Sequence, residues 1–197
     1  MIRRALHTVR AARSGVAAVE FALLTPVLFL MLMGLFDLAY NLYTQTLLQG
    51  AIQDAARDSS LEDADATTAT IDARVTKAVQ DVAPGATLSF SRTSYTSFSS
   101  IGKPEDYTDT NKNGRCDAGE PFEDVNENNA WDSSQGINGL GGSRDVVVYL
   151  VTVTYPRPFP VAKLMGMSSD FTMNARTVLA NQPWDNLAKT PPIGKCP

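Results

Sequence analysis

Oxygen-bearing side chains recur at fixed spacing in a segment rich in Asp, Asn and Gly. In residues 109–120 they occupy positions 1, 3, 5, 9 and 12, and Gly114 lies at position 6. A calcium ion collects about six to eight oxygen ligands, which this alternation directs inward around a sharp turn. The sequence therefore predicts a Ca2+ loop, in which Arg115 offers its backbone carbonyl. The expected ligands are Asp109, Asn111, Asn113, Arg115, Asp117 and Glu120.

A second, poorer copy of this pattern occupies residues 124–135. Its sixth position is Asn129, which tolerates a left-handed backbone, and its twelfth is Gln135, which cannot chelate as an acid would. Together the two copies resemble the EF-hand-like repeats of bacterial surface proteins. Pro121 follows the first loop directly, so we expect loops without flanking helices. The expected ligands are Asp124, Asn126, Asn128, Ala130 and Asp132.

Both loops lie in an acidic insertion, residues 103–144. From Glu105 to Asp132 it holds nine acids and two bases, so without a cation the segment repels itself. We expect structural calcium that orders residues 105–135. The alternative is a solvated, disordered acidic loop, because Asn, Asp and Gly also favour disorder.

The composition argues against several classes of function. The net charge is −4, and removal of residues 1–15 with their four arginines would leave −8. The rest of the chain has no Lys/Arg cluster, so we expect no nucleic-acid partner. The only histidine of the full sequence is His7, inside residues 1–15, so a processed chain would lack a Ser-His-Asp or Cys-His pair. We therefore expect no enzyme and no small-molecule substrate; a tethered enzyme would have only carboxylates to use.

An apolar segment, Val16–Phe36, precedes the part of the chain that carries the loops. It has 21 residues and one charge, Glu20. A helix of this length spans roughly 30 Å, the thickness of the hydrocarbon core of a bilayer. Arginines precede the segment and Asp37 follows it. The positive-inside rule then places the N-terminus in the cytoplasm and the remainder across the membrane.

Glu20 needs an explanation, because an acid in a membrane helix costs free energy and usually serves a function. It lies five residues after Gly15, behind a basic leader and four small residues. This arrangement resembles the prepilin signal of type IV pilins. The resemblance implies that a prepilin peptidase cuts after Gly15, and that Glu20 pairs with the new amine of Val16 on a neighbouring subunit. An ordinary signal anchor with a stray Glu remains an alternative. A Sec signal peptide fits less well, because the apolar run is long and no small-x-small site follows it.

The segment from Gly15 to Pro26 reads G-V-A-A-V-E-F-A-L-L-T-P, with Phe21 after the glutamate, and a later stretch ends in Ala55-Ala56-Arg57. These strings resemble the TadE/TadF family, pseudopilins of the tight-adherence (Tad or Flp) pilus apparatus. That family opens G-x-x-x-V-E-F-A-x-x-x-P and continues alanine-rich to A-A-R. The resemblance covers about 45 residues, and the helix end departs from it, since Asp58-Ser-Ser follows.

We expect an α+β, pilin-like fold with a long N-terminal helix from about residue 16 to 58. Half of this helix would lie in the membrane, and half would pack on a small antiparallel sheet. A short helix over 71–82 follows a polar connector (61–70), and strands are expected near 87–93, 146–155 and 171–180, before an irregular Pro-rich tail (183–197). The expected parts are the leader (1–15), the membrane helix (16–36), the first half of the head (37–102), the insertion (103–144) and the rest of the head (145–197).

The two cysteines, Cys116 and Cys196, both lie on the expected non-cytoplasmic side. An even number of cysteines in an oxidising compartment favours a disulfide, which would close a loop of about 80 residues. Two free thiols are the alternative.

Two functions share these features. The first is a minor pilin or pseudopilin of a Tad-type pilus, held in the inner membrane with a periplasmic head and able to join other pilin subunits in an extracellular fibre. The second is a membrane-anchored calcium-dependent adhesin that never enters a filament. The first requires cleavage after Gly15, and the second does not.

Overall fold

The computed structural model describes residues 15–59, 64–182 and 190–197. The predicted leader, apart from Gly15, lies outside the described residues, as do parts of the connector and of the Pro-rich tail. The chain forms two compact units. Among the described residues, the first unit contains residues 15–43 and Pro156–Phe171, and the second contains those of Thr44–Tyr155 and Thr172–Pro197.

The long N-terminal helix is confirmed as α2 (Val16–Ser59), with Pro26 inside it. Large apolar side chains of its first half, such as Leu23 and Met31, are exposed. The helix is long and apolar enough to cross a membrane, and no part of its most apolar 18-residue stretch is buried. An apolar surface of this extent is typical of a segment that lies against lipid or another protein.

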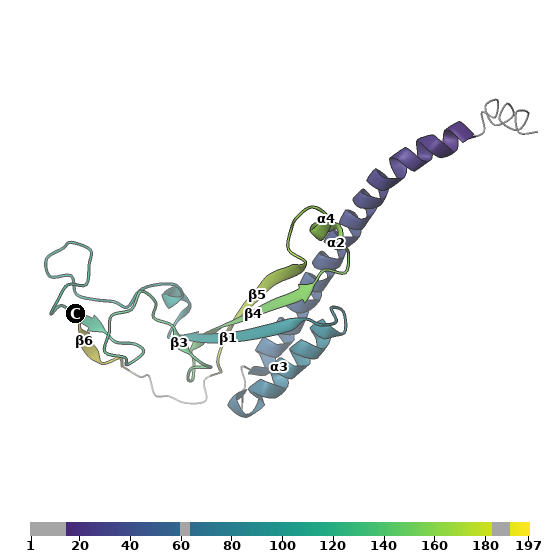
Figure 1. Cartoon of the computed structure of the whole chain (residues 1–197). Helices are drawn as coiled ribbons and strands as arrows, with labels where there is room; N and C mark the ends of the chain where they lie inside the picture. The colour runs from purple at the N-terminus through teal and green to yellow at the C-terminus, as the bar shows by residue number, and fades with distance from the viewer. Residues whose placement is uncertain (1–14, 60–63, 183–189) are drawn as a thin grey trace, which may run out of the picture. The chain divides into compact units, whose positions relative to one another are not determined.

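In the second unit, the C-terminal half of α2 contributes to a conventional core. Helix α3 (Ala64–Gln80) contacts strand β1 (Thr87–Tyr95) (Figure 1). Apolar side chains at helical spacing on both helices are buried, as expected for amphipathic helices packed on a sheet. They are Leu48, Ile52, Ala55 and Ala56 of α2 and Ile71, Val75 and Val79 of α3.

The main sheet has the order β3-β1-β4-β5, in which β3 is the two-residue strand Ile137–Asn138. Strand β4 (Val146–Pro156) lies between β1 and β5 (Asp170–Ala180), and it pairs with β1 in antiparallel register from Thr87↔Thr154 to Tyr95↔Val146. Its buried residues include every second position from Val147 to Tyr155, because successive side chains of a strand point to opposite faces. The predicted α+β class is confirmed, and β4 has a neighbouring strand on each side.

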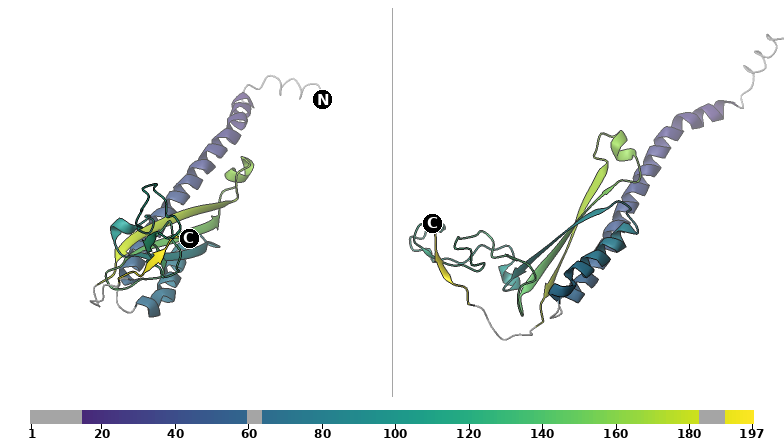
Figure 2. Two further views of the ribbon diagram at one scale, coloured as in Figure 1. Left: turned by 90° about the vertical axis from the view of Figure 1, so that its left-hand side faces the viewer. Right: turned by 60° about the horizontal axis from the view of Figure 1, so that its bottom comes forward.

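Several elements differ from the sequence predictions. Helix α3 begins at Ala64, inside the predicted connector, where alanines favour helix. The insertion contains two short strands, β2 (Pro121–Glu123) and β3 (Ile137–Asn138), and a 3-10 turn, η2 (Phe98–Ser100), precedes it. The tail is not wholly irregular, since β6 (Ile193–Lys195) pairs with β2. Figures 1 and 2 show β6 beside the loops of the insertion.

A polar cluster joins α3 to two strands of the sheet. Asp72 accepts hydrogen bonds from Arg92 at 2.5 and 3.1 Å and from the Tyr149 hydroxyl at 2.7 Å. The Arg92 guanidinium lies 4.3 Å from the centre of the Tyr149 ring. Burial, followed by the hydrogen bond to Asp72, raises the pKa of Tyr149 far above its usual value, so the hydroxyl keeps its proton.

We expect Asp72→Asn to lower the free energy of unfolding by about 2 kcal/mol, because it leaves the mostly buried Arg92 without a counter-charge. Urea unfolding of the full chain in detergent micelles would measure the loss. Asp81→Asn is the matched control, since its ion pair with Lys77 is exposed and should be worth less than about 0.5 kcal/mol. Equal effects of the two substitutions would contradict a structural role for the cluster.

Candidate functional site

The two predicted loops have the same backbone conformation. In the first loop (residues 109–120), Lys112 and Gly114 have positive φ angles of 59° and 77°. In the second loop (residues 124–135), Glu127 and Asn129 have positive φ angles of 59° and 61°. These residues stand at positions 4 and 6 of each loop. Asparagine tolerates the left-handed conformation better than most residues, so it can replace glycine at position 6.

The aspartate at position 1 folds each loop around its own carboxylate. Asp109 accepts hydrogen bonds from the backbone N–H of Asn113 at 3.2 Å and of Gly114 at 2.8 Å. Asp124 accepts the equivalent bonds from Asn128 and Asn129 at 3.0 and 2.8 Å. The two loops therefore repeat one another in structure as well as in sequence.

The side chains at positions 3, 5 and 9 converge in both loops. Asp117 Oδ2 lies 2.7 Å from Asn111 Nδ2 and 2.5 Å from Asn113 Nδ2. These two hydrogen bonds lower the pKa of Asp117, so its carboxylate stays ionised. The equivalent side chains of the second loop are Asn126, Asn128 and Asp132. There Asp132 Oδ2 lies 2.7 Å from the Nδ2 atom of each asparagine.

A glutamate closes each loop, and only one of the two follows from the sequence pattern. Glu120, at position 12, accepts hydrogen bonds from the N–H of Thr110 at 2.8 Å and of Asp117 at 3.0 Å. In the second loop, Glu105 accepts the equivalent bonds from positions 2 and 9, Val125 at 2.8 Å and Asp132 at 2.9 Å.

Glu105 comes before the first loop in the chain, so the twelve-residue spacing gave no signal for it. The residue at position 12 of the second loop, Gln135, instead donates from Nε2 to the carbonyl of Pro104 at 2.8 Å. Glu105 is therefore the residue of this site that the sequence analysis missed.

Three carboxylates of the loops are buried: the exposed fractions of Glu105, Asp124 and Glu120 are 0%, 2% and 7%. None of them forms a salt bridge in the described part of the chain. Carboxylate and amide oxygens are the ligands of hard cations such as Ca2+. No group of three or more His, Cys, Asp and Glu side chains in the described ranges is already gathered to hold a metal. The ligand types thus suit calcium, and four of the ten proposed side-chain ligands are asparagine amides.

A disulfide and backbone hydrogen bonds join the C-terminal residues to the insertion. Cys116 and Cys196 form a disulfide with their Cα atoms 5.6 Å apart. Gly119 N–H donates to the carbonyl of Cys196 at 3.0 Å, and Cys196 N–H donates to the carbonyl of Glu120 at 2.8 Å. Gly194 packs so closely on the buried Phe122 that a Cβ there would lie 2.4 Å from the ring. A side chain at position 194 would therefore push β6 away from β2.

The predicted processing residues lie at the start of α2 in the first unit. Gly15 directly precedes the helix, and Val16, Glu20 and Phe21 lie in its first two turns. All four are exposed, and a Cβ at Gly15 would meet nothing within 4 Å. The structure thus leaves this end of the helix accessible.

Residues 15–57 match the model of the TadE-like protein family. The match begins at Gly15 and ends at Arg57, so it covers nearly all of α2, and it supports the resemblance to TadE-like pilins. It does not extend to the sheet or the insertion. The comparisons with curated proteins and with solved structures found no match.

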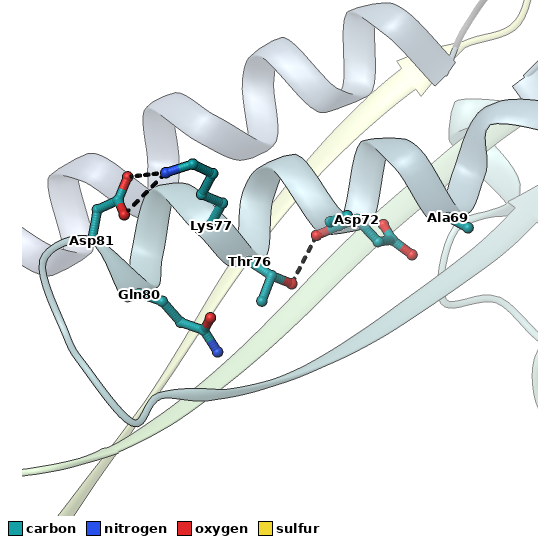
Figure 3. Close-up of a pocket in the computed structure, with 7 residues that line it drawn as sticks. Ala69, Asp72, Thr76, Lys77, Gln80 and Asp81 are labelled. Carbon is teal, nitrogen blue, oxygen red and sulfur yellow. Dashed lines mark hydrogen bonds and ion pairs between the residues drawn. The ribbon is translucent and has the colours of Figure 1, made fainter.

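A hollow on the surface of α3 offers no competing site (Figure 3). Its polar residues are already engaged: Lys77 pairs with Asp81, Thr76 donates to the carbonyl of Asp72, and Gln80 donates to the carbonyl of Ala86 at 2.9 Å. The Asp72 carboxylate belongs to the cluster with Arg92 and Tyr149. We assign no ligand to this hollow.

Proposed function

We propose that the protein is a minor pilin or pseudopilin of a Tad-type pilus. In this proposal a prepilin peptidase removes the leader after Gly15, and the subunit assembles through the apolar half of α2. The head faces the periplasm before assembly and the exterior in a fibre. Ca2+ bound by the two loops stabilises the head.

The observation that carries the proposal is α2 itself. Its first half is apolar and exposed, and the match to the TadE-like model covers nearly all of the helix. A helix of this kind needs lipid or other helices around it. Glu20 on the exposed surface is available to pair with the amine of Val16 in a neighbouring subunit, which would neutralise both charges inside a packed assembly.

The calcium part rests on the buried carboxylates. Burying a charge is costly unless the charge is paired or coordinates a metal. Glu105, Asp124 and Glu120 receive only backbone N–H donors among their assigned hydrogen bonds. A divalent cation in each loop would supply the missing positive charge. Its ligands would be Asp109, Asn111, Asn113, Arg115, Asp117 and Glu120 in the first loop, and Asp124, Asn126, Asn128, Ala130, Asp132 and Glu105 in the second.

N-terminal sequencing tests the processing step. Coexpressed with a prepilin peptidase, the protein should begin at Val16, whereas Gly15→Val should keep its leader because the peptidase requires the small residue at the cut. Gly34→Val is the matched control: Gly34 lies within α2, and a Cβ there, as at Gly15, would meet nothing within 4 Å. It should be processed normally.

A chain that begins at Met1 or Ile2 would contradict the pilin proposal. If such an unprocessed chain were also missing from purified filaments, a calcium-dependent membrane-anchored adhesin would be the better interpretation.

A further inference from the structure

The loop between β4 and β5 exposes large apolar side chains. Within Pro156–Phe171, helix α4 (Val161–Leu164) buries Val161 and Ala162. The residues that follow turn outward: the exposed fractions of Leu164, Met165 and Met167 are 69%, 63% and 50%. Three neighbouring apolar side chains exposed in this way form a small apolar tip, defined here as residues 164–167.

This loop is attached to α2 within the first unit (Figure 1). The Phe159 ring stacks on the Phe36 ring with centroids 6.1 Å apart. Arg157 forms an ion pair with Asp37, and both side chains are mostly buried. The Arg157 guanidinium also lies 4.7 Å from the centre of the Phe171 ring. These contacts fix the base of the loop at Phe36 and Asp37.

Phe36 and Asp37 mark the end of the apolar segment of α2. The β4–β5 loop therefore contacts the helix at the level where a membrane-spanning segment would reach the lipid headgroups. The ion pair neutralises the acid at this boundary, which lowers the cost of placing it near lipid. Tyr43, exposed further along the same helix, is of the residue type enriched at membrane surfaces.

We propose that the apolar tip inserts into the leaflet of the phospholipid bilayer at the C-terminal end of the α2 span. Leu164, Met165 and Met167 enter the acyl-chain boundary, and the exposed Lys163 reaches the phosphate groups. Lipid is the occupant because the base of the loop that carries the tip is held at Phe36 and Asp37, where the apolar segment Val16–Phe36 ends. The inference rests on the membrane role proposed for α2. It adds a second contact with the bilayer, which would fix the position of the helix in the membrane.

Site-specific fluorescence in single-chain nanodiscs tests this contact. Leu164→Cys and Met167→Cys replace exposed residues, and the native cysteines are already paired, so a polarity-sensitive thiol dye labels one site. With nitroxide lipids in the disc, both probes should lose emission, most strongly when the nitroxide lies near the headgroups. Their emission should be blue-shifted, and iodide in the buffer should quench them little.

Two labelled controls separate the possible outcomes. Phe98→Cys, an exposed apolar position in the second unit, should be quenched by iodide and not by lipid. Leu24→Cys, in the middle of the apolar segment, should be quenched by deep nitroxides. If deep nitroxides did not quench the probe at Leu24, the membrane role of α2 itself would be overturned. Quenching at Leu24 with iodide-accessible probes at 164 and 167 would overturn only the tip proposal, as would probes protected from both quenchers.

Discussion

Glu105→Gln will abolish or strongly weaken calcium binding at the second loop and leave the first loop unchanged. A carboxylate can bind calcium through two oxygens and supplies a negative charge, whereas an amide offers one oxygen and no charge. We expect the affinity of the second loop to fall at least about tenfold, a free-energy loss of about 1.4 kcal/mol or more. The substitution also deprives Asp132 N–H or Val125 N–H of an acceptor oxygen.

Glu120→Gln will give the reciprocal result at the first loop, because Glu120 makes the same pair of contacts there. Titration calorimetry of the full chain in detergent micelles would resolve the two sites. Glu123→Gln is the matched control, since it removes the same charge from the exposed side of β2. If Glu105→Gln and Glu123→Gln bound calcium alike, Glu105 would not be a ligand.

Limited proteolysis gives an independent measurement of the same proposal. Calcium should protect residues 105–135, and a chelator should expose them, because the buried carboxylates repel one another without a cation. Equal cleavage rates with and without chelator would remove calcium from the proposed function. The native protein is the reference here, so the result does not depend on whether a variant folds.

The first loop could be predicted because its features are local. All its proposed ligands lie within twelve consecutive residues, and Gly114 at position 6 marks the left-handed turn that the backbone then adopts. The long helix was predictable for the same reason, since Val16–Phe36 carries a single charge, Glu20, and no proline follows Pro26 until Pro84.

The closing residue of the second loop could not be predicted, because it depends on a crossing of two chain segments. Glu105 N–H donates to the carbonyl of Asp132 at 3.0 Å, and Trp131 Nε1 donates to the carbonyl of Glu105 at 2.9 Å. These contacts bring residues 26 and 27 positions apart together. A twelve-residue motif that starts at Asp124 ends at Gln135 and so misses the carboxylate that Glu105 contributes to the loop.

Other features escaped the sequence analysis for a similar reason. Strand β6 has three residues between prolines, and only its pairing with β2 makes it a strand. Arg157 and Asp37 are 120 positions apart, and neither carries a local signal of its partner. Periodicity identifies elements that bury a face along their length, while these contacts depend on tertiary structure.

Cys116→Ser combined with Cys196→Ser will release the C-terminal strand from the insertion. The disulfide spans 80 residues, and a bridge of this length constrains the unfolded chain by about 4–5 kcal/mol in the entropic model. Without it, β2 and β6 form a two-stranded ribbon of three residues each, which is marginal in water. Hydrogen exchange should accelerate at Gly119, Asp124 and Cys196 or its replacement, whose N–H groups join the two segments. Exchange at Val151 in the main sheet is the internal reference.

The same double variant tests whether the bridge supports calcium binding. Cys116 stands between Arg115 and Asp117 in the first loop, and the carbonyl of Glu120 accepts the N–H of Cys196. The C-terminal segment thus contacts the closing residue of the first loop. It also reaches the second loop, where Asp124 N–H donates to the carbonyl of Pro192 at 2.9 Å, but the assigned contacts of the closing residue Glu105 involve only the insertion. We therefore expect the first loop to lose more affinity than the second. An equal loss at both loops would mean that the disulfide stabilises the insertion as a whole, and unchanged binding with unchanged exchange would mean that β6 is held without it.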